Sequence, residues 1–181
     1  MRERLRCGGS IAAAALVAIC LGCSNGLEGF APARGARPEL PPAELEGVIF
    51  EGYRGEQREL FVTAEKATVD LVARVAALER VTLQFSESER GRIEVGAPIG
   101  ELKLDEDDFL LSGGVVGSAQ AGESFSTESV RYIAASRELV SSTPVELRRT
   151  NLLLRANGMK LGLDARRLRL VGQVHARVLQ Q

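Results

Sequence analysis

Apolar and polar residues alternate along several short stretches of the chain. The alternation is clearest at residues 81–85, 92–95, 145–147, 168–170 and 174–178. A period of two places every second side chain on the same face of a strand, so each stretch predicts a half-buried β-strand. Glycines and polar residues separate the stretches, at residues 86–92, 105–108, 117–123 and 141–144. Short strands with such regular turn signals predict an all-β architecture.

An internal repeat runs through the same region. Four apolar residues that lie 34, 30 and 29 positions apart mark the starts of its units: Phe61, Val95, Phe125 and Leu154. The residue two positions after each start is small: Thr63, Ala97, Thr127 and Ala156. Valine follows each start by 20 residues: Val81, Val115, Val145 and Val174. The repeat predicts stacked β-hairpins, each of which needs a neighbour to cover its apolar face.

One segment, residues 64–80, has a competing pattern. Its apolar positions, Leu71, Val72, Val75 and Leu78, together with several alanines, fit one face of an amphipathic helix. The repeat instead places two strands here, joined by a turn around residues 71–74. Because tertiary context often overrides helix propensity, we predict the two strands.

The first 23 residues predict export and a membrane tether. Arg2, Arg4 and Arg6 precede an apolar run at residues 11–21, which is the order of a secretory signal. The segment at residues 20–23, which ends at Cys23, resembles a bacterial lipoprotein lipobox, and this implies that Cys23 carries a lipid. Cys20 stands where the lipobox prefers an aliphatic residue, so an uncleaved anchor is the alternative. The 16 residues from 7 to 22 fall short of the roughly 20 that span a bilayer.

Composition divides the remainder of the chain into a tether and a body. Residues 24–44 hold four of the six prolines and show no periodic apolar pattern, which predicts an extended tether. The predicted β domain follows at residues 45–181. From residue 24 onward 20 Lys and Arg stand against 23 Asp and Glu, a net charge of about −3. Residues 148–181 nevertheless hold eight basic residues and one acid. For an exported protein this basic end suits a phosphorylated lipid or an acidic protein face rather than nucleic acid.

Catalytic and metal-binding patterns are absent from the sequence. It has no Gly-x-Ser-x-Gly nucleophile motif, no phosphate-binding glycine loop and no Cys or His pair at metal-ligand spacing. His175, the only histidine, is expected on the surface of a strand. Residues 105–108 form an acidic cluster without the glycine and glutamate of a calcium loop, so we expect an acidic turn. We therefore expect neither enzymatic activity nor a cofactor or metal.

Residues 123–179 resemble the C-terminal half of LptC, the membrane-tethered periplasmic component of the lipopolysaccharide-export machine. The pattern is carried by residues 126–127, 130–132, 139–145, 156–160 and 168–174. Residues 55–85 are similar to the first repeat of that family, and the likeness covers roughly residues 47–179. The resemblance implies a twisted, partly open antiparallel β jelly roll that binds the acyl chains of lipopolysaccharide in an apolar groove. It also implies that the protein receives the lipid from inner-membrane transporter subunits and passes it to a soluble LptA-like bridge protein.

The groove predicted from this resemblance is lined by the inward positions of the strands. The candidates are Val81, Leu83, Phe85, Val115, Val145, Leu147, Leu168, Leu170, Val174 and Val178. A filled core would have the same sequence pattern, so a structural envelope lipoprotein remains an alternative, as does a carrier of another amphiphile. A hydrolase is the least favoured hypothesis.

The last strand, residues 168–179, is the predicted pairing edge for another bridge protein, because an uncovered edge offers unpaired backbone groups. The candidate edge residues are Leu168, Leu170, Val174, Ala176, Val178, Arg167, Arg169 and Arg177.

The family implies that the tether is in the inner membrane, whereas Ser24 after Cys23 resembles an outer-membrane address.

Overall fold

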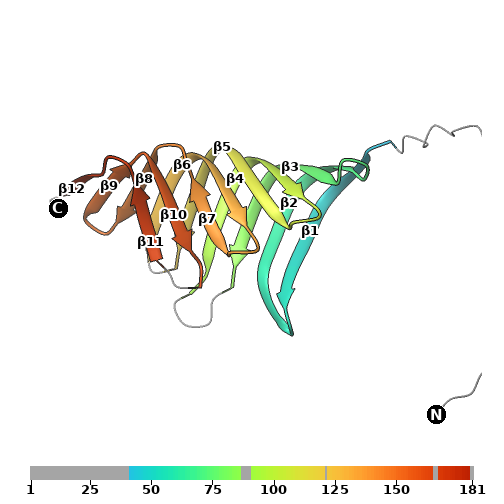
Figure 1. The fold of residues 1–181 in the computed structure, drawn as a ribbon, viewed down its shortest axis with the longest axis horizontal. Helices are drawn as coiled ribbons and strands as arrows, with labels where there is room; N and C mark the ends of the chain where they lie inside the picture. The colour runs from blue at the N-terminus through green and yellow to red at the C-terminus, as the bar shows by residue number, and fades with distance from the viewer. Residues whose placement is uncertain (1–40, 87–90, 121, 165–166, 180–181) are drawn as a thin grey trace, which may run out of the picture. The chain divides into compact units, whose positions relative to one another are not determined.

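The computed structural model describes residues 41–86, 91–120, 122–164 and 167–179. These residues contain no helix, and their strands lie in one compact unit, Pro38–Gln181 (Figure 1). The signal segment, Cys23 and most of the tether lie outside the described residues. The twelve strands are β1 Ala43–Arg54, β2 Gln57–Asp70, β3 Val75–Phe85, β4 Ile93–Lys103, β5 Asp108–Ala119, β6 Glu123–Ile133, β7 Glu138–Ser141, β8 Val145–Arg149, β9 Leu152–Ala156, β10 Gly158–Gly162, β11 Arg167–Val171 and β12 His175–Val178.

All twelve strands belong to one antiparallel sheet, which confirms the predicted all-β fold. The strands β1 to β6 pair in chain order, and the sheet then divides, because one end of β6 pairs with β7 and the other with β8. One branch continues through β10 to β11, and the other through β9 to β12. Figure 1 shows the strands following one another from β1 at the right to β12 at the left. The open jelly roll is therefore a single sheet and not two separate ones.

The segment with the competing helical pattern forms β2 and β3, as the repeat predicts. Their register pairs Lys66 with Glu79 and Ala67 with Leu78. Asp70 stabilises the turn between them, because its carboxylate accepts hydrogen bonds from the backbone N–H groups of Val72 and Ala73, both at 2.8 Å. A local turn of this kind competes with helix formation, and pairing with β1 and β4 then favours the strands.

Each of the six long strands β1 to β6 is interrupted near its middle, and the breaks between β7 and β8, β9 and β10, and β11 and β12 continue the same line across the sheet. The pairing of β2 with β3, for example, passes from Thr63↔Thr82 to Lys66↔Glu79. Comparable gaps in register occur along the chain at Gly47, Glu65, Arg80, residues 97–98, residues 113–114, Glu128, residues 142–144, Asn157 and residues 172–174. We call this line of positions the bend row.

Glycine and proline explain several of these bends. Gly113 and Gly114, at the bend of β5, have φ angles of 85° and 93°, which side-chain-bearing residues rarely adopt. Pro98 and Pro144 lie at the bends of β4 and of β7–β8, where a missing backbone donor interrupts the ladder. The bend row therefore follows from the local sequence.

The bend row divides the sheet into two half-sheets. Half-sheet 1 contains residues 43–46, 66–70, 75–79, 99–103, 108–112 and 129–133 together with β7, β10 and β11. Half-sheet 2 contains residues 48–54, 57–63, 81–85, 93–96, 115–119 and 123–127 together with β8, β9 and β12.

The hydrophobic core lies between the two half-sheets. The Phe85 ring of half-sheet 2 contacts the Tyr132 ring of half-sheet 1 with centroids 4.9 Å apart. Phe50 of half-sheet 2 likewise meets Phe109 of half-sheet 1 at 5.9 Å. Along the bend row the repeat positions pair directly, valine against a small residue: Val81↔Ala97, Val115↔Thr127 and Val145↔Ala156. Small partners let the half-sheets approach each other where the sheet bends.

A buried hydroxyl network holds the bend between β7 and β8. Thr127 Oγ1 lies 3.0 Å from Ser141 Oγ and 2.8 Å from Thr143 Oγ1, and it donates to the Pro144 carbonyl at 2.9 Å. Thr127 and Ser141 are almost fully buried. The network satisfies polar groups that the interrupted ladder leaves without strand partners.

Replacing Thr127 with valine should lower the free energy of unfolding by about 1–3 kcal/mol, because the buried Ser141 hydroxyl and Pro144 carbonyl lose a partner. Thr68→Val, at an exposed strand position, is the matched control and should change stability by no more than about 0.5 kcal/mol. Urea denaturation of both variants measures the difference. Equal stabilities would show that the network does not hold the bend.

Candidate functional site

An apolar pocket of about 520 Å³ lies between the half-sheets at the C-terminal end of the unit. Leucines from both half-sheets contribute to it: Leu147, Leu152 and Leu154 from β8 and β9, and Leu161 and Leu168 from β10 and β11. The other lining residues are Arg92, Ile93, Ser118, Ala119, Glu123, Ser124, Phe125 and Arg149. Its volume falls in the range of small-molecule sites.

The pocket forms where the interior contains no large aromatic pair. Between β1 and β7 the rings of Phe50, Phe85, Phe109 and Tyr132 fill the space between the half-sheets. Near β8 to β12 the inward side chains are mostly leucines, and the last strands are short. The facing surfaces therefore leave an unfilled volume at this end.

Phe125 has its position in the pocket because its cross-strand partner is Gly117. A Cβ atom at position 117 would overlap the Phe125 ring. Glycine at position 117 therefore allows the Phe125 ring to pack against the backbone of β5.

Three charged residues, Arg92, Glu123 and Arg149, are part of the pocket lining. Arg149 Nε lies 3.1 Å from Glu123 Oε1, and both residues line the pocket. Glu146 alternates with the pocket residue Leu147 and so faces the outer side of β8, where it pairs with Arg148 at 2.8 Å and with Arg155 of β9 at 2.9 Å. Hydrogen bonds from these two arginines lower the pKa of Glu146, so this carboxylate stays ionised. An apolar interior with the Glu123–Arg149 pair as its ionic rim suits an amphiphile.

The structure divides the predicted groove residues into two groups. Val81, Leu83, Phe85, Val115 and Val145 are at most 2% exposed and lie in the packed interior. Leu147 and Leu168 line the pocket, and Leu170 is half-buried against the core. Val174 and Val178 are 49% and 67% exposed.

Several pocket residues were missed in the sequence. Leu152 and Leu154 belong to a run of three leucines that shows no alternation, and Leu161 follows a glycine-containing segment. Ile93 and Phe125 were each part of a predicted strand or repeat but were not assigned to a site. The spacing of Leu152 and Leu154 was the available signal, although Leu153 between them obscured it.

The predicted last strand is two strands. Among the described strands, β11 is the outer strand of half-sheet 1 and pairs with β10 alone, whereas β12 is the outer strand of half-sheet 2 and pairs with β9 alone. Gly172, with φ 85°, lies in the break between them. On β12, Ala176 and Val178 pair with the pocket residues Leu154 and Leu152, and Arg177 pairs with Leu153. On β11, Arg167 and Arg169 flank the pocket residue Leu168 and so face the outer surface.

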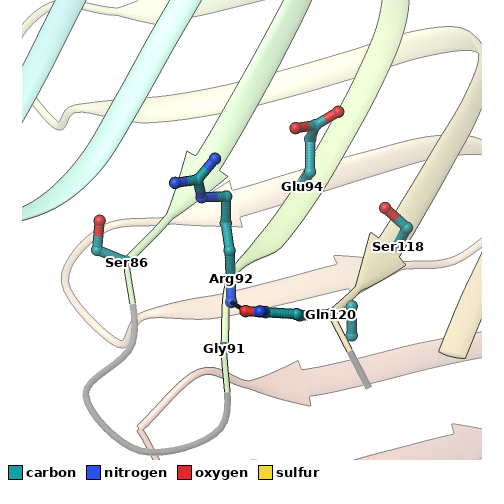
Figure 2. Close-up of a pocket in the computed structure, with 7 residues that line it drawn as sticks. Ser86, Gly91, Arg92, Glu94, Ser118 and Gln120 are labelled. Carbon is teal, nitrogen blue, oxygen red and sulfur yellow. Dashed lines mark hydrogen bonds between the residues drawn. The ribbon is translucent and has the colours of Figure 1, made fainter. Parts of the chain in front are cut away.

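A second depression, polar and about 610 Å³, lies beside the ends of β4 and β5 (Figure 2). Its lining includes Ser86, Glu94 and Gln120, and the Gln120 side chain accepts a hydrogen bond from the Arg92 backbone at 3.3 Å. Figure 2 shows the Arg92 side chain extending away from Gln120, toward Ser86 and Glu94. His175, the only histidine, is on β12, so the two serines that line this depression, Ser86 and Ser118, have no imidazole base beside them. We assign no chemistry to it.

The acidic cluster at residues 105–108 forms the turn between β4 and β5. Asp105 pairs with Arg74, Glu106 with Lys103 at 3.3 Å, and Asp108 accepts from the Ala134 N–H at 2.9 Å. No group of three metal-ligating side chains occurs among the residues that the structure describes. Within the same residues, no helix is long and apolar enough to cross a bilayer.

Comparison with known proteins identifies the family. No curated protein matches the chain. The family described as "Lipopolysaccharide-assembly, LptC-related" matches residues 12–179, which include the whole described β unit as far as its last residue. Its members are transport-bridge proteins of the periplasm, associated with the inner membrane, and not a known enzyme family. The chain belongs to this LptC-related family and takes part in lipopolysaccharide transport.

Proposed function

We propose that the protein binds acyl chains of lipopolysaccharide in the apolar pocket between β8 and β11 and passes them to a second bridge protein at the adjoining edge. The observation that carries this proposal is the position of the pocket, which combines leucines from both half-sheets and adjoins the outer strands β11 and β12. The ionic rim would remain with the polar headgroup while the chains enter the interior.

The free energy of burying an acyl chain in the pocket favours transfer of the lipid over its storage. Burying an acyl chain contributes about 0.8 kcal/mol per CH₂ relative to water. The same chain is already buried in a bilayer, so the pocket offers little net gain over the membrane. A carrier with this balance can release its lipid to a similar neighbouring pocket, and energy supplied elsewhere in the export system gives the direction.

Two alternatives remain distinct from this proposal. A structural lipoprotein would have a filled interior, and the interior is filled at Leu83, Phe85 and Val115. The pocket at the C-terminal end favours a carrier, and membership of the lipopolysaccharide-transport family favours that lipid over another amphiphile.

The tether through Cys23 remains a prediction of the sequence, tested by mass spectrometry of the mature N-terminus.

A photocrosslinking amino acid at position 154 should form an adduct with lipopolysaccharide in cells. Leu154 lines the pocket, whereas the neighbouring Leu153 on β9 faces the opposite side of the strand. The same amino acid at position 153 is therefore the matched control and should give little or no adduct. Immunoblotting for lipopolysaccharide in the crosslinked product measures both. Equal adducts at the two positions, or none at 154 in a folded protein, would contradict lipid binding in the pocket.

We also propose that β12 pairs with a strand of the partner bridge protein. The Leu179 N–H donates to the Asn151 carbonyl at 2.6 Å, so these two residues form a hydrogen-bonded pair. Hydrogen-bonded and non-bonded pairs alternate along an antiparallel ladder, which makes Arg177 the next bonded residue. The N–H groups of Ala176 and Val178 consequently point to the free edge.

Ala176→Pro should weaken capture of the partner bridge protein, because it removes an edge donor without removing a bond between β9 and β12. Ala176→Val keeps the donor and is the control. Pull-down with the purified soluble bridge protein should fall roughly tenfold for the proline variant alone, as expected when strand pairing loses one or two hydrogen bonds. Undiminished capture by a folded Ala176→Pro protein would exclude β12 as the pairing edge.

A further inference from the structure

An ion cluster around the buried side chain of Arg137 joins the half-sheets on the side opposite the bend row. The Arg137 guanidinium lies 2.5 Å from Glu59 Oε1 and 3.2 Å from Asp164 Oδ1. Arg54 also contacts Glu59, at 3.2 Å. Arg137 is in the β6–β7 turn and Asp164 follows β10, both in half-sheet 1, whereas Glu59 is on β2 in half-sheet 2. The cluster therefore connects elements that are distant in sequence and lie on opposite sides of the core.

Arg137 is an unusual residue for its position. Its side chain is only 9% exposed, and its φ angle of 50° lies in the left-handed region. Its Nε is buried without a hydrogen-bond partner among the described residues. A buried cation carries a desolvation cost, and leaving one donor unsatisfied adds to it. Such an arrangement is poorly suited to maximal stability and suits an interaction that can be released.

The cluster lies over the part of the interior that is filled. Tyr132 of β6 pairs with Leu139 of β7, two residues after Arg137. The centroid of the Tyr132 ring lies 4.9 Å from that of Phe85 and 6.5 Å from that of Phe109. Phe85 in turn pairs with Ile93, which lines the apolar pocket. A continuous apolar path therefore leads from the pocket to the aromatic side chains beneath the cluster.

We propose that Glu59, Arg137 and Asp164 form a latch that closes the half-sheets over the aromatic interior, and that its release extends the C-terminal pocket toward β3. This inference rests on the proposed lipid-binding function and concerns how the same site is regulated. In the latched state only the pocket accepts an acyl chain. In the released state the half-sheets separate on the side of the latch, while the bend row continues to join them as a hinge.

Acyl chains supply the free energy that favours the released state. A ligand shifts a conformational equilibrium only through its different affinity for the two states. A chain longer than the pocket can bury its remaining carbons only when the interior opens. Asp164, which is 60% exposed, leaves one side of the latch accessible to water, so the ion pairs can separate without first exposing the core.

Single-cysteine reporters test the latch in the absence of lipid. The three cysteines all lie in the first 23 residues, so a protein that begins after residue 23 gives a cysteine-free background. Leu139→Cys places a reporter in the interior two residues from Arg137, and Val115→Cys places one beside the bend row; both positions are 0% exposed. Glu59→Gln breaks the latch. Arg58→Gln, which removes the Glu51 ion pair from the same hairpin, is the control.

Maleimide should modify the position-139 cysteine roughly tenfold faster in Glu59→Gln than in the parent, the change expected from losing one charge-assisted hydrogen bond. In Glu59→Gln, maleimide should modify the position-115 cysteine at a rate within twofold of the rate in the parent. Arg58→Gln should change the modification rate at neither position. Acceleration at both reporters would indicate general loosening and would overturn the latch, as would an unchanged rate at position 139. Circular dichroism confirms that each variant is folded.

The two proposals fail separately. A photocrosslinking amino acid at position 132 should capture lipopolysaccharide in Glu59→Gln and much less in the otherwise native protein. Absence of a crosslink at position 154 would refute lipid binding in the pocket, whatever the reporter rates. If position 154 forms the crosslink, but Glu59→Gln captures no more lipopolysaccharide at position 132 than the otherwise native protein does, the pocket proposal stands and the latch is refuted.

Discussion

The rest of the structure depends on one line of breaks across the sheet, which passes through the middles of β1 to β6 and between the later strands. A continuous twelve-stranded sheet would expose one apolar face, whereas the bend row folds that face onto itself and creates an interior. The left-handed glycines of β5 and the hydroxyl network around Thr127 show how the local sequence produces the bends. The pocket, the edges and the ion cluster all derive their positions from this line.

A sheet folded in this way stays open along the side opposite its bends and at its two ends. Aromatic packing and the Arg137 cluster occupy the open side near β1 to β7. At the C-terminal end, leucines line the remaining space without filling it. The same architecture thus provides a stable core and a site for an acyl chain, and the two differ only in the side chains that face inward.

Sequence analysis predicted the fold more completely than the site. Alternation and the repeat identified β2 and β3 against a helical pattern, and the repeat valines lie along the bend row. Alternation specifies which face of a strand is turned inward, but it does not specify whether the opposite half-sheet fills the space. Leu83 is therefore in the packed core and Leu168 in the pocket, although both follow the same pattern. The break at Gly172 was missed because one glycine within alternating residues is compatible with a continuous strand.

Hydrogen exchange of the protein with and without lipopolysaccharide, followed by mass spectrometry, tests the central claim most directly. The claim is that lipid enters the space between the half-sheets at the C-terminal end. It predicts that lipopolysaccharide slows amide exchange in β8, β9 and β11, which contribute Leu147, Leu154 and Leu168 to the pocket. Slower exchange confined to β1 and β2, with no change around the pocket, would contradict it.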